Sequence, residues 1–232
     1  NGLGSAALAS LADSQLNALT SVNLTALANT QLDGLTSLQL TALADSQLNG
    51  LTSSQLASLV GTQLDGLTSI QLTALANTQL DGLTSAGLTG LAITQLNGLS
   101  SMQLASFAAT QLAGLTAAQM ASLADTQLGG LASSQISQFT TTQLSALTAP
   151  AITALTTTQV DGLLVTHIQA ITTTQIAALT DIQLDSLDAA QTAAYASTAA
   201  WQAAGITTTQ ITAIGTNNIS APMSILFGYP ST

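Results

Sequence analysis

An eight-residue repeat is the feature that most constrains how this chain folds. One register position recurs every eight residues from 15 to 191, without insertion or deletion, and 19 of its 23 occurrences are Gln. The exceptions are Asn23, Gly87, Ala151 and His167. An apolar residue follows nearly every register position, and another lies four residues after it, so the unit reads Gln-Leu-x-x-Leu-[Thr/Ala]-x-x. This period predicts a solenoid, because one unit cannot bury its own apolar stripe and neighbours must stack.

A second period of sixteen residues lies over the first. Glycine recurs at the same position of alternate octads from Gly34 to Gly130, and again at Gly162. A hydroxyl residue follows most of these glycines two positions later, and Asp or Asn precedes many of them. The fundamental unit is therefore a pair of unlike octads.

The spacing of the leucines favours helix over strand. Leucines three residues apart share one face of a helix but lie on opposite faces of a strand. Ala, Leu and Gln are also good helix formers. Thr36 and Gln39 have the spacing of a capping box, in which the Gln39 amide is bound by the hydroxyl and the Gln39 side chain reaches back. Gly50 is predicted to end a helix in the left-handed conformation that glycine permits.

These signals predict an all-α solenoid of short helices on an 8/16-residue repeat. We expect one helix of about a dozen residues per sixteen, for example from Thr36 to Asn49, ended by a Gly-Leu-Thr corner. The leucines of its buried stripe, with their equivalent in a later repeat, form the predicted core: Leu40, Leu43, Leu48, Leu51 and Leu72.

Two other architectures remain open at this level. One has two shorter helices per sixteen residues, with breaks near Asn29, Asp45, Gly61 and Asn77. The other is a β-solenoid with sixteen residues per coil, because Asn-Gly and Asp-Gly are also hairpin signals. In each case the sequence divides into a degenerate N-terminal repeat or cap (1–14), the octapeptide-repeat solenoid (15–191) and a C-terminal cap with an apolar tail (192–232).

The charge inventory excludes several classes of partner. The chain has no Lys, Arg or Glu, and its ten acidic residues are all Asp, which gives a net charge of −10. Nothing can neutralise phosphates, so we expect no binding to nucleic acid or to an anionic membrane surface. No apolar run is long enough for membrane insertion. Cysteine is absent, so there are no disulfides or thiol ligands.

The same inventory argues against catalysis and cofactors. A single His and scattered Asp residues offer no triad or phosphate loop, so we expect no enzyme activity. His167 stands in a Gln position and is predicted to make the hydrogen bonds of its Gln equivalents. Asp residues before the glycines would form a column that attracts Ca²⁺, yet ordinary helix-terminal chemistry accounts for them more simply. We therefore expect no cofactor.

The octads resemble a known kind of array. Residues 35–43 (Leu-Thr-Ser-Leu-Gln-Leu-Thr-Ala-Leu) and 171–179 are similar to the Leu-Thr-x-x-Gln-[Leu/Val/Ile]-x-x-Leu arrays of large secreted or surface proteins of Gram-negative bacteria, many of them adhesin-like or haemagglutinin-like. The resemblance covers residues 15–191. It implies an extracellular or cell-surface location on bacteria and carries no activity residues.

Our leading hypothesis is a structural subunit of an extracellular filament or of an adhesin stalk. Open solenoid ends favour head-to-tail self-assembly of identical copies. The C-terminal tail supplies the predicted assembly interface: Met223, Ile225, Leu226, Phe227 and Tyr229. One alternative is a ligand-binding or ice-binding surface, on which Thr141, Thr157 and Thr173 would line up. Another is a passive spacer within a longer secreted polypeptide.

Overall fold

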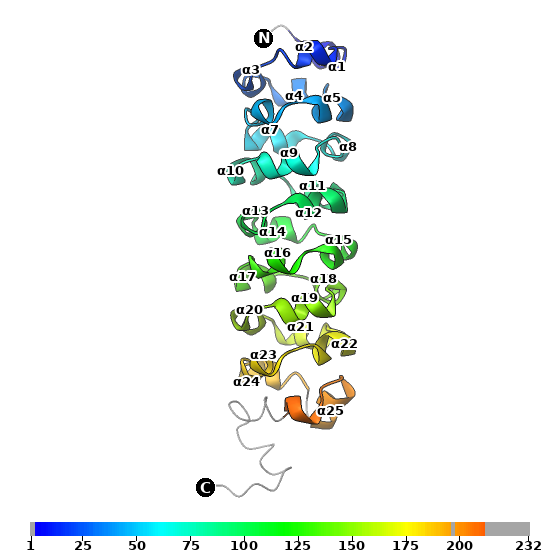
Figure 1. The fold of residues 1–232 in the computed structure, drawn as a ribbon, viewed down its shortest axis with the longest axis vertical. Helices are drawn as coiled ribbons and strands as arrows, with labels where there is room; N and C mark the ends of the chain where they lie inside the picture. The colour runs from blue at the N-terminus through cyan, green and yellow to red at the C-terminus, as the bar shows by residue number, and fades with distance from the viewer. Residues whose placement is uncertain (1–2, 196–197, 212–232) are drawn as a thin grey trace, which may run out of the picture. The chain divides into compact units, whose positions relative to one another are not determined.

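The computed structural model describes residues 3–195 and 198–211, and the chain divides into two compact units, Asn1–Gln119 and Met120–Thr232. Short α-helices follow one another with brief connections throughout the described residues, which contain no strand (Figure 1). The predicted all-α solenoid of short helices is confirmed, and the β-solenoid alternative is wrong.

The helices of the first unit each span four to six residues. They are α1 (Ser5–Ala9), α2 (Asp13–Leu16), α3 (Ser21–Thr25), α4 (Asn29–Leu32), α5 (Ser37–Ala42), α6 (Asp45–Leu48), α7 (Ser53–Ser58), α8 (Gly61–Leu64), α9 (Ser69–Ala74), α10 (Asn77–Leu80), α11 (Ser85–Gly90), α12 (Ile93–Gly98), α13 (Ser101–Ser106) and α14 (Ala109–Leu112).

The boundary between the units falls within α15 (Ala117–Ser122). The second unit continues the same series: α16 (Asp125–Gly129), α17 (Ser133–Ile136), α18 (Thr141–Ala146), α19 (Ala149–Ala154), α20 (Thr157–Asp161), α21 (Val165–Ala170), α22 (Thr173–Ala177), α23 (Asp181–Asp185), α24 (Ala189–Thr192) and α25 (Thr198–Ala203).

Each octad forms its own helix, so the expected helix from Thr36 to Asn49 is wrong. That stretch holds α5 and α6, because Leu43 leaves the helical region (φ −67°, ψ 138°) and Ala44 follows it as an extended N-cap. The version with two short helices per sixteen residues is correct. Its four predicted break points are the first residues of α4, α6, α8 and α10: Asn29, Asp45, Gly61 and Asn77.

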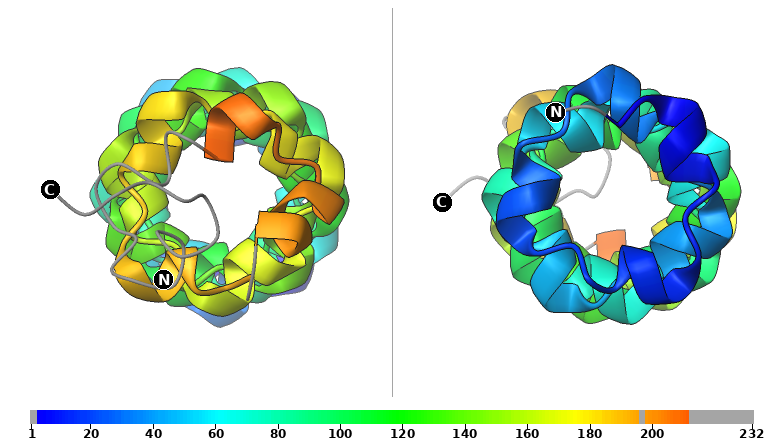
Figure 2. Two further views of the ribbon diagram at one scale, coloured as in Figure 1. Left: turned by 90° about the horizontal axis from the view of Figure 1, so that it is seen from below. Right: turned by 90° about the horizontal axis from the view of Figure 1, so that it is seen from above.

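Within each unit the helices wind into a coil. Each helix packs on the third helix along the chain, as α9 does on α12 in the first unit and α18 on α21 in the second. Hydrogen bonds between turns join residues 25, 28 and 31 apart. One turn therefore takes about 28 residues, or about 3.5 octads. The end view shows the first helices of the first unit, in dark blue, following one another around a ring (Figure 2, right).

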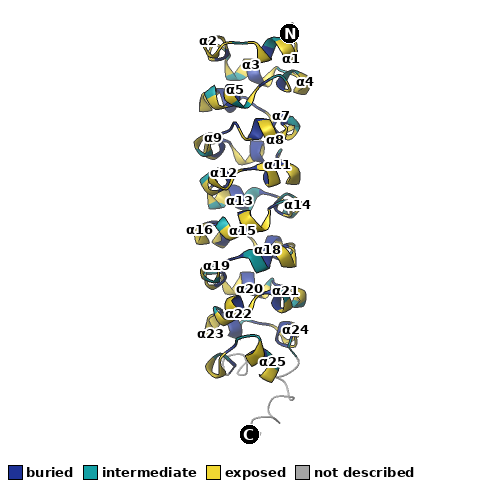
Figure 3. Ribbon diagram, turned by 90° about the vertical axis from the view of Figure 1, so that its right-hand side faces the viewer, coloured by how far each residue is buried: buried dark blue, intermediate teal, exposed yellow. Residues whose placement is uncertain are grey.

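The core consists of the two apolar positions of each octad. The residue after the Gln is almost fully buried, with Leu40, Leu48 and Leu72 at most 1% exposed. The residue four after the Gln is nearly as well covered, with Leu43 and Leu51 at 3% and 2%. Every turn thus carries buried and exposed residues side by side along the chain (Figure 3). Burial of this apolar stripe supplies the main driving force for folding, and the chain has no Lys or Arg to pair with its Asp residues.

The register changes character after Gln191. Trp201 of α25 is fully buried and donates from Nε1 to the Thr192 carbonyl oxygen at 3.2 Å. Its ring packs against Tyr195 with centroids 4.6 Å apart. The predicted assembly residues of the tail, Met223 to Tyr229, lie outside the described residues.

Candidate functional site

The Gln of each octad joins two turns of the coil with one carboxamide. The Gln71 side chain, 5% exposed, accepts the Thr68 backbone N–H at Oε1 (2.8 Å). Its Nε2 donates to the carbonyl oxygens of Leu40 (3.1 Å) and Leu43 (2.7 Å), which lie on the preceding turn. The Gln therefore caps the start of its own helix and also the end of a helix in the preceding turn, where backbone carbonyl groups have no partner within that helix.

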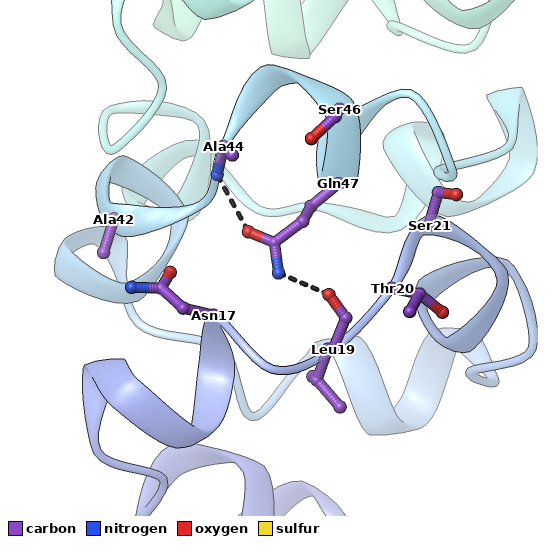
Figure 4. Close-up of a pocket in the computed structure, with 8 residues that line it drawn as sticks. All are labelled: Asn17, Leu19, Thr20, Ser21, Ala42, Ala44, Ser46 and Gln47. Carbon is purple, nitrogen blue, oxygen red and sulfur yellow. Dashed lines mark hydrogen bonds between the residues drawn. The ribbon is translucent and has the colours of Figure 1, made fainter.

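The Thr half of the capping box occurs mainly in alternate octads of the first unit. The Thr36 hydroxyl accepts the Gln39 backbone N–H at 3.2 Å, while Gln39 Oε1 accepts the Thr36 N–H at 3.0 Å. In the next octad the N-cap is Ala44, which has no hydroxyl. Gln47 still accepts the Ala44 N–H (2.9 Å) and donates to the Leu19 carbonyl oxygen (2.5 Å; Figure 4). The Gln bonds are thus common to both octads, and the Thr bond is not.

Gly50 does not end a helix in the left-handed conformation, so that part of the capping prediction is wrong. Among the described glycines only Gly205 has a positive φ. The reason for glycine at position 50 is the approach of another turn: a Cβ there would lie 2.1 Å from the backbone oxygen of Ser21. The same backbone contact, 29 residues back, recurs at Gly34, Gly66, Gly82 and Gly114.

A Thr ladder between turns was not anticipated from the sequence. The Thr41 hydroxyl lies 2.5 Å from the Gly66 carbonyl oxygen and 2.9 Å from the Ser37 carbonyl oxygen of its own helix, so its single proton is shared. Bonds from the same octad position reach 25 residues forward from Thr25, Thr41, Thr73, Thr89 and Thr153. Recurrence of Thr two residues after the register position was the available signal.

These contacts explain why the unlike octads alternate. The Gly66 and Ser37 backbones meet, and so do Thr41 and Gly66. Both contacts connect an octad with the third octad after it, since Gln39 and Gln63 are 24 residues apart. Because the two types of octad alternate, an octad and the third one after it are always of different types. Within the first unit, the glycine-ended octads from Gly34 to Gly114 therefore each meet a Ser-started octad of the other type.

Residues sixteen apart do not line up, because sixteen residues are a little more than half of a turn of about 28. Thr141, Thr157 and Thr173 are all exposed, but Thr157 lies about half a turn away from both Thr141 and Thr173 in the coil of the second unit. The expected flat Thr array is therefore wrong, and the expected Asp column fails for the same reason. The described residues contain no group of three acidic, His or Cys side chains able to hold a metal ion.

His167 occupies its Gln position as predicted. The imidazole is 3% exposed, and its Nδ1 accepts the Leu164 backbone N–H at 3.2 Å. It also hydrogen-bonds the Phe139 backbone, 28 residues earlier, where a Gln would donate. Burial lowers the pKa of His167, and the Phe139 bond offsets part of that effect.

A shallow pocket between α2–α3 and α5–α6 has no titratable lining residue (Figure 4). It is lined by Asn17, Leu19, Thr20, Ser21, Ala42, Ala44, Ser46 and Gln47. The Gln47 carboxamide, the buried polar side chain of the lining, is already bonded to Ala44 and Leu19. In the part of the chain that the structure describes, no helix is long and apolar enough to cross a bilayer.

No model of a known protein family matches the chain, and no curated protein matches it. The fold itself defines the class, an α-solenoid repeat protein whose turns are joined by buried Gln carboxamides.

Proposed function

We propose that the chain is a structural subunit of an extracellular filament or of an adhesin stalk on a bacterial surface, in which copies join head to tail. The joint uses the first turn of one copy's coil, and the last turn together with the C-terminal tail, residues 219–230, of the next. The location follows the resemblance of residues 15–191 to surface-protein arrays.

The observation that carries the proposal is a set of donors on the first turn. Gln15 and Asn23 are exposed, whereas their equivalents from Gln39 onward are mostly buried. Their side-chain oxygens cap their own helices, accepting the Ala12 N–H and the Thr20 N–H. Among the described residues, the side-chain nitrogens of Gln15 and Asn23 have no hydrogen-bond acceptor. The equivalent nitrogen of Gln39, Nε2, donates to carbonyl oxygens of the preceding turn.

A second copy of the chain offers acceptors for these donors of the first turn. Every turn offers carbonyl oxygens at helix ends, and the coil uses them repeatedly as acceptors for Gln. The contact between turns is heterologous, because amide donors of one turn meet carbonyls of the turn before. A heterologous contact that does not close on itself produces fibres. The charged fraction of only 4% keeps repulsion between copies low.

The test is assembly of the purified chain, followed by sedimentation velocity and negative-stain microscopy. We expect the full chain to form filaments. A chain lacking residues 219–232, and the double variant Gln15→Leu/Asn23→Leu, should each keep a helical circular-dichroism spectrum and stay monomeric.

Gln138→Leu is the matched control, because Gln138 is exposed and lies outside the register. It should assemble as the unmodified chain does. Filaments of undiminished length from both the truncated chain and the double variant would overturn the proposed joint. A full chain that stays monomeric at high concentration would overturn self-assembly itself.

A further inference from the structure

His167 is the one side chain in the Gln register that changes its hydrogen-bonding capacity near neutral pH. The Gln carboxamide does not titrate, whereas imidazole takes up a proton at about pH 6.5 when it is exposed. The chain contains no other His. We propose that His167 is an acid-sensitive joint, at which α21 separates from the preceding turn when the surroundings become mildly acidic.

The geometry requires the neutral imidazole. Nδ1 accepts the Leu164 N–H at 3.2 Å, and only an unprotonated nitrogen has a lone pair for that bond. A proton on Nδ1 would point at the Leu164 N–H, so two donors would face each other. The interaction with the Phe139 backbone favours the charged imidazole but only partly offsets the effect of burial.

Helix α21 has little else to hold its first turn. Its N-cap is Leu164, which has no hydroxyl, so the Thr half of the capping box is missing. The neighbouring helix α22 has both halves, with Thr172 accepting the Gln175 N–H at 3.2 Å and Gln175 accepting the Thr172 N–H at 2.7 Å. Loss of the His167 bond therefore leaves the start of α21 without any side-chain cap.

No counter-ion is placed to stabilise a charged imidazole. Helix α18, which packs on α21, carries no titratable residue, and the only one at α24 is its N-cap, Asp188. Asp188 is exposed, and its carboxylate accepts the Gln191 N–H at 2.7 Å. Asp161, at the end of α20, is also exposed. Tyr195 donates its hydroxyl to the Ile168 carbonyl oxygen and carries no charge at these pH values.

The sign of the effect follows from proton linkage. Burial holds the pKa of His167 below the value that the same residue has in the open chain. Between those two pKa values the open form binds more protons, so stability of the joint falls as the pH drops below about 6.5. One proton can raise the opening constant by at most about tenfold per pH unit, and the loss ends below the folded pKa.

Two measurements on the full chain test this proposal. The imidazole Hε1 resonance is unique, and its titration by NMR should give a pKa below 6.5 in the folded chain. Hydrogen exchange, corrected for intrinsic rates, should show protection of Leu164 and α21 falling several-fold between pH 7 and pH 5. In His167→Gln, which restores the register residue, that protection should not change over the same range.

The reciprocal variant Gln175→His should transfer the effect. It places an imidazole opposite Leu147, where Gln175 now donates at 2.6 Å, and acid-dependent exchange should appear at α22, with a smaller amplitude than at α21 because the Thr172 hydroxyl still caps that helix. A His167 pKa at or above 6.5, or equal pH dependence in the unmodified chain and His167→Gln, would overturn the proposal. Failure of these tests leaves the proposed head-to-tail assembly untouched, because the contact of α21 with the preceding turn lies within one chain.

Discussion

Substitution of Gly82 by Ala tests the close approach between turns. A Cβ at this position would lie 1.9 Å from the Ser53 carbonyl oxygen and 2.7 Å from its Cα. Both are backbone atoms, so no side chain can rotate away and the two turns must separate. Residue 57, the equivalent of Thr41, is Ala, so no Thr bond to residue 82 complicates the result.

The expected change combines two opposing effects. Forcing extra volume into a packed contact costs about 1–3 kcal/mol. Replacing Gly by Ala where φ is negative returns about 0.4–1 kcal/mol by restricting the unfolded chain. The net loss for Gly82→Ala is then about 1–2 kcal/mol. With an m-value of about 2 kcal/mol/M, the urea midpoint should fall by about 0.5–1 M.

Gly90→Ala is the matched control for this urea titration, followed by circular dichroism at 222 nm. Gly90 has the same place in the other type of octad, and the nearest atom to its Cβ, the Gly61 Cα, is 3.8 Å away. Gly90→Ala should be neutral or slightly stabilising. Equal midpoints for Gly82→Ala and Gly90→Ala would refute the claim that glycine is needed for contact between turns.

Two further predictions concern the buried positions of the same coil. Gln71→Leu should lower the free energy of unfolding by about 2–4 kcal/mol, because the carbonyl oxygens of Leu40 and Leu43 lose their donor. Gln15→Leu should change the free energy of unfolding by less than about 1 kcal/mol. Equal urea midpoints for these two variants would contradict the role given to Gln. Leu72→Asp should cost several kcal/mol, because it places an unpaired charge at a position that is fully buried; an unchanged thermal midpoint would show that Leu72 is not in the core.

The sequence was sufficient for the class of fold and for the core. The leucine spacing and the Thr36–Gln39 pattern depend on interactions within one octad, and such local interactions can be predicted from a repeating sequence pattern. The prediction from the sequence was wrong at Leu43, where a helix-favouring residue adopts an extended conformation. Gln47 caps a new helix there by accepting the Ala44 N–H, and its Nε2 binds the Leu19 carbonyl oxygen, 28 residues earlier, which a local pattern does not reveal.

The length of the turn was beyond the reach of sequence reasoning. A glycine period of sixteen suggested a coil of sixteen, but contacts three octads apart also produce alternation. The wrong turn length then misplaced the Thr and Asp residues into columns, whereas the terminating role predicted for Gly50 came from helix C-cap chemistry. Ala178 carries a further clue, since Thr153 lies 2.9 Å from its carbonyl oxygen, compared with 2.5 Å at Gly66. This hydrogen bond is longer where a methyl group replaces the hydrogen of the glycine.

The most direct test of the account is the set of nuclear Overhauser contacts made by the Gln71 side-chain amide in solution. The structure predicts contacts to Leu40 and Leu43, 31 and 28 residues earlier, together with the Thr68 amide of its own helix. Contacts to residues about sixteen positions away, around Gln55, with none to Leu40 or Leu43, would contradict a turn of about 28 residues.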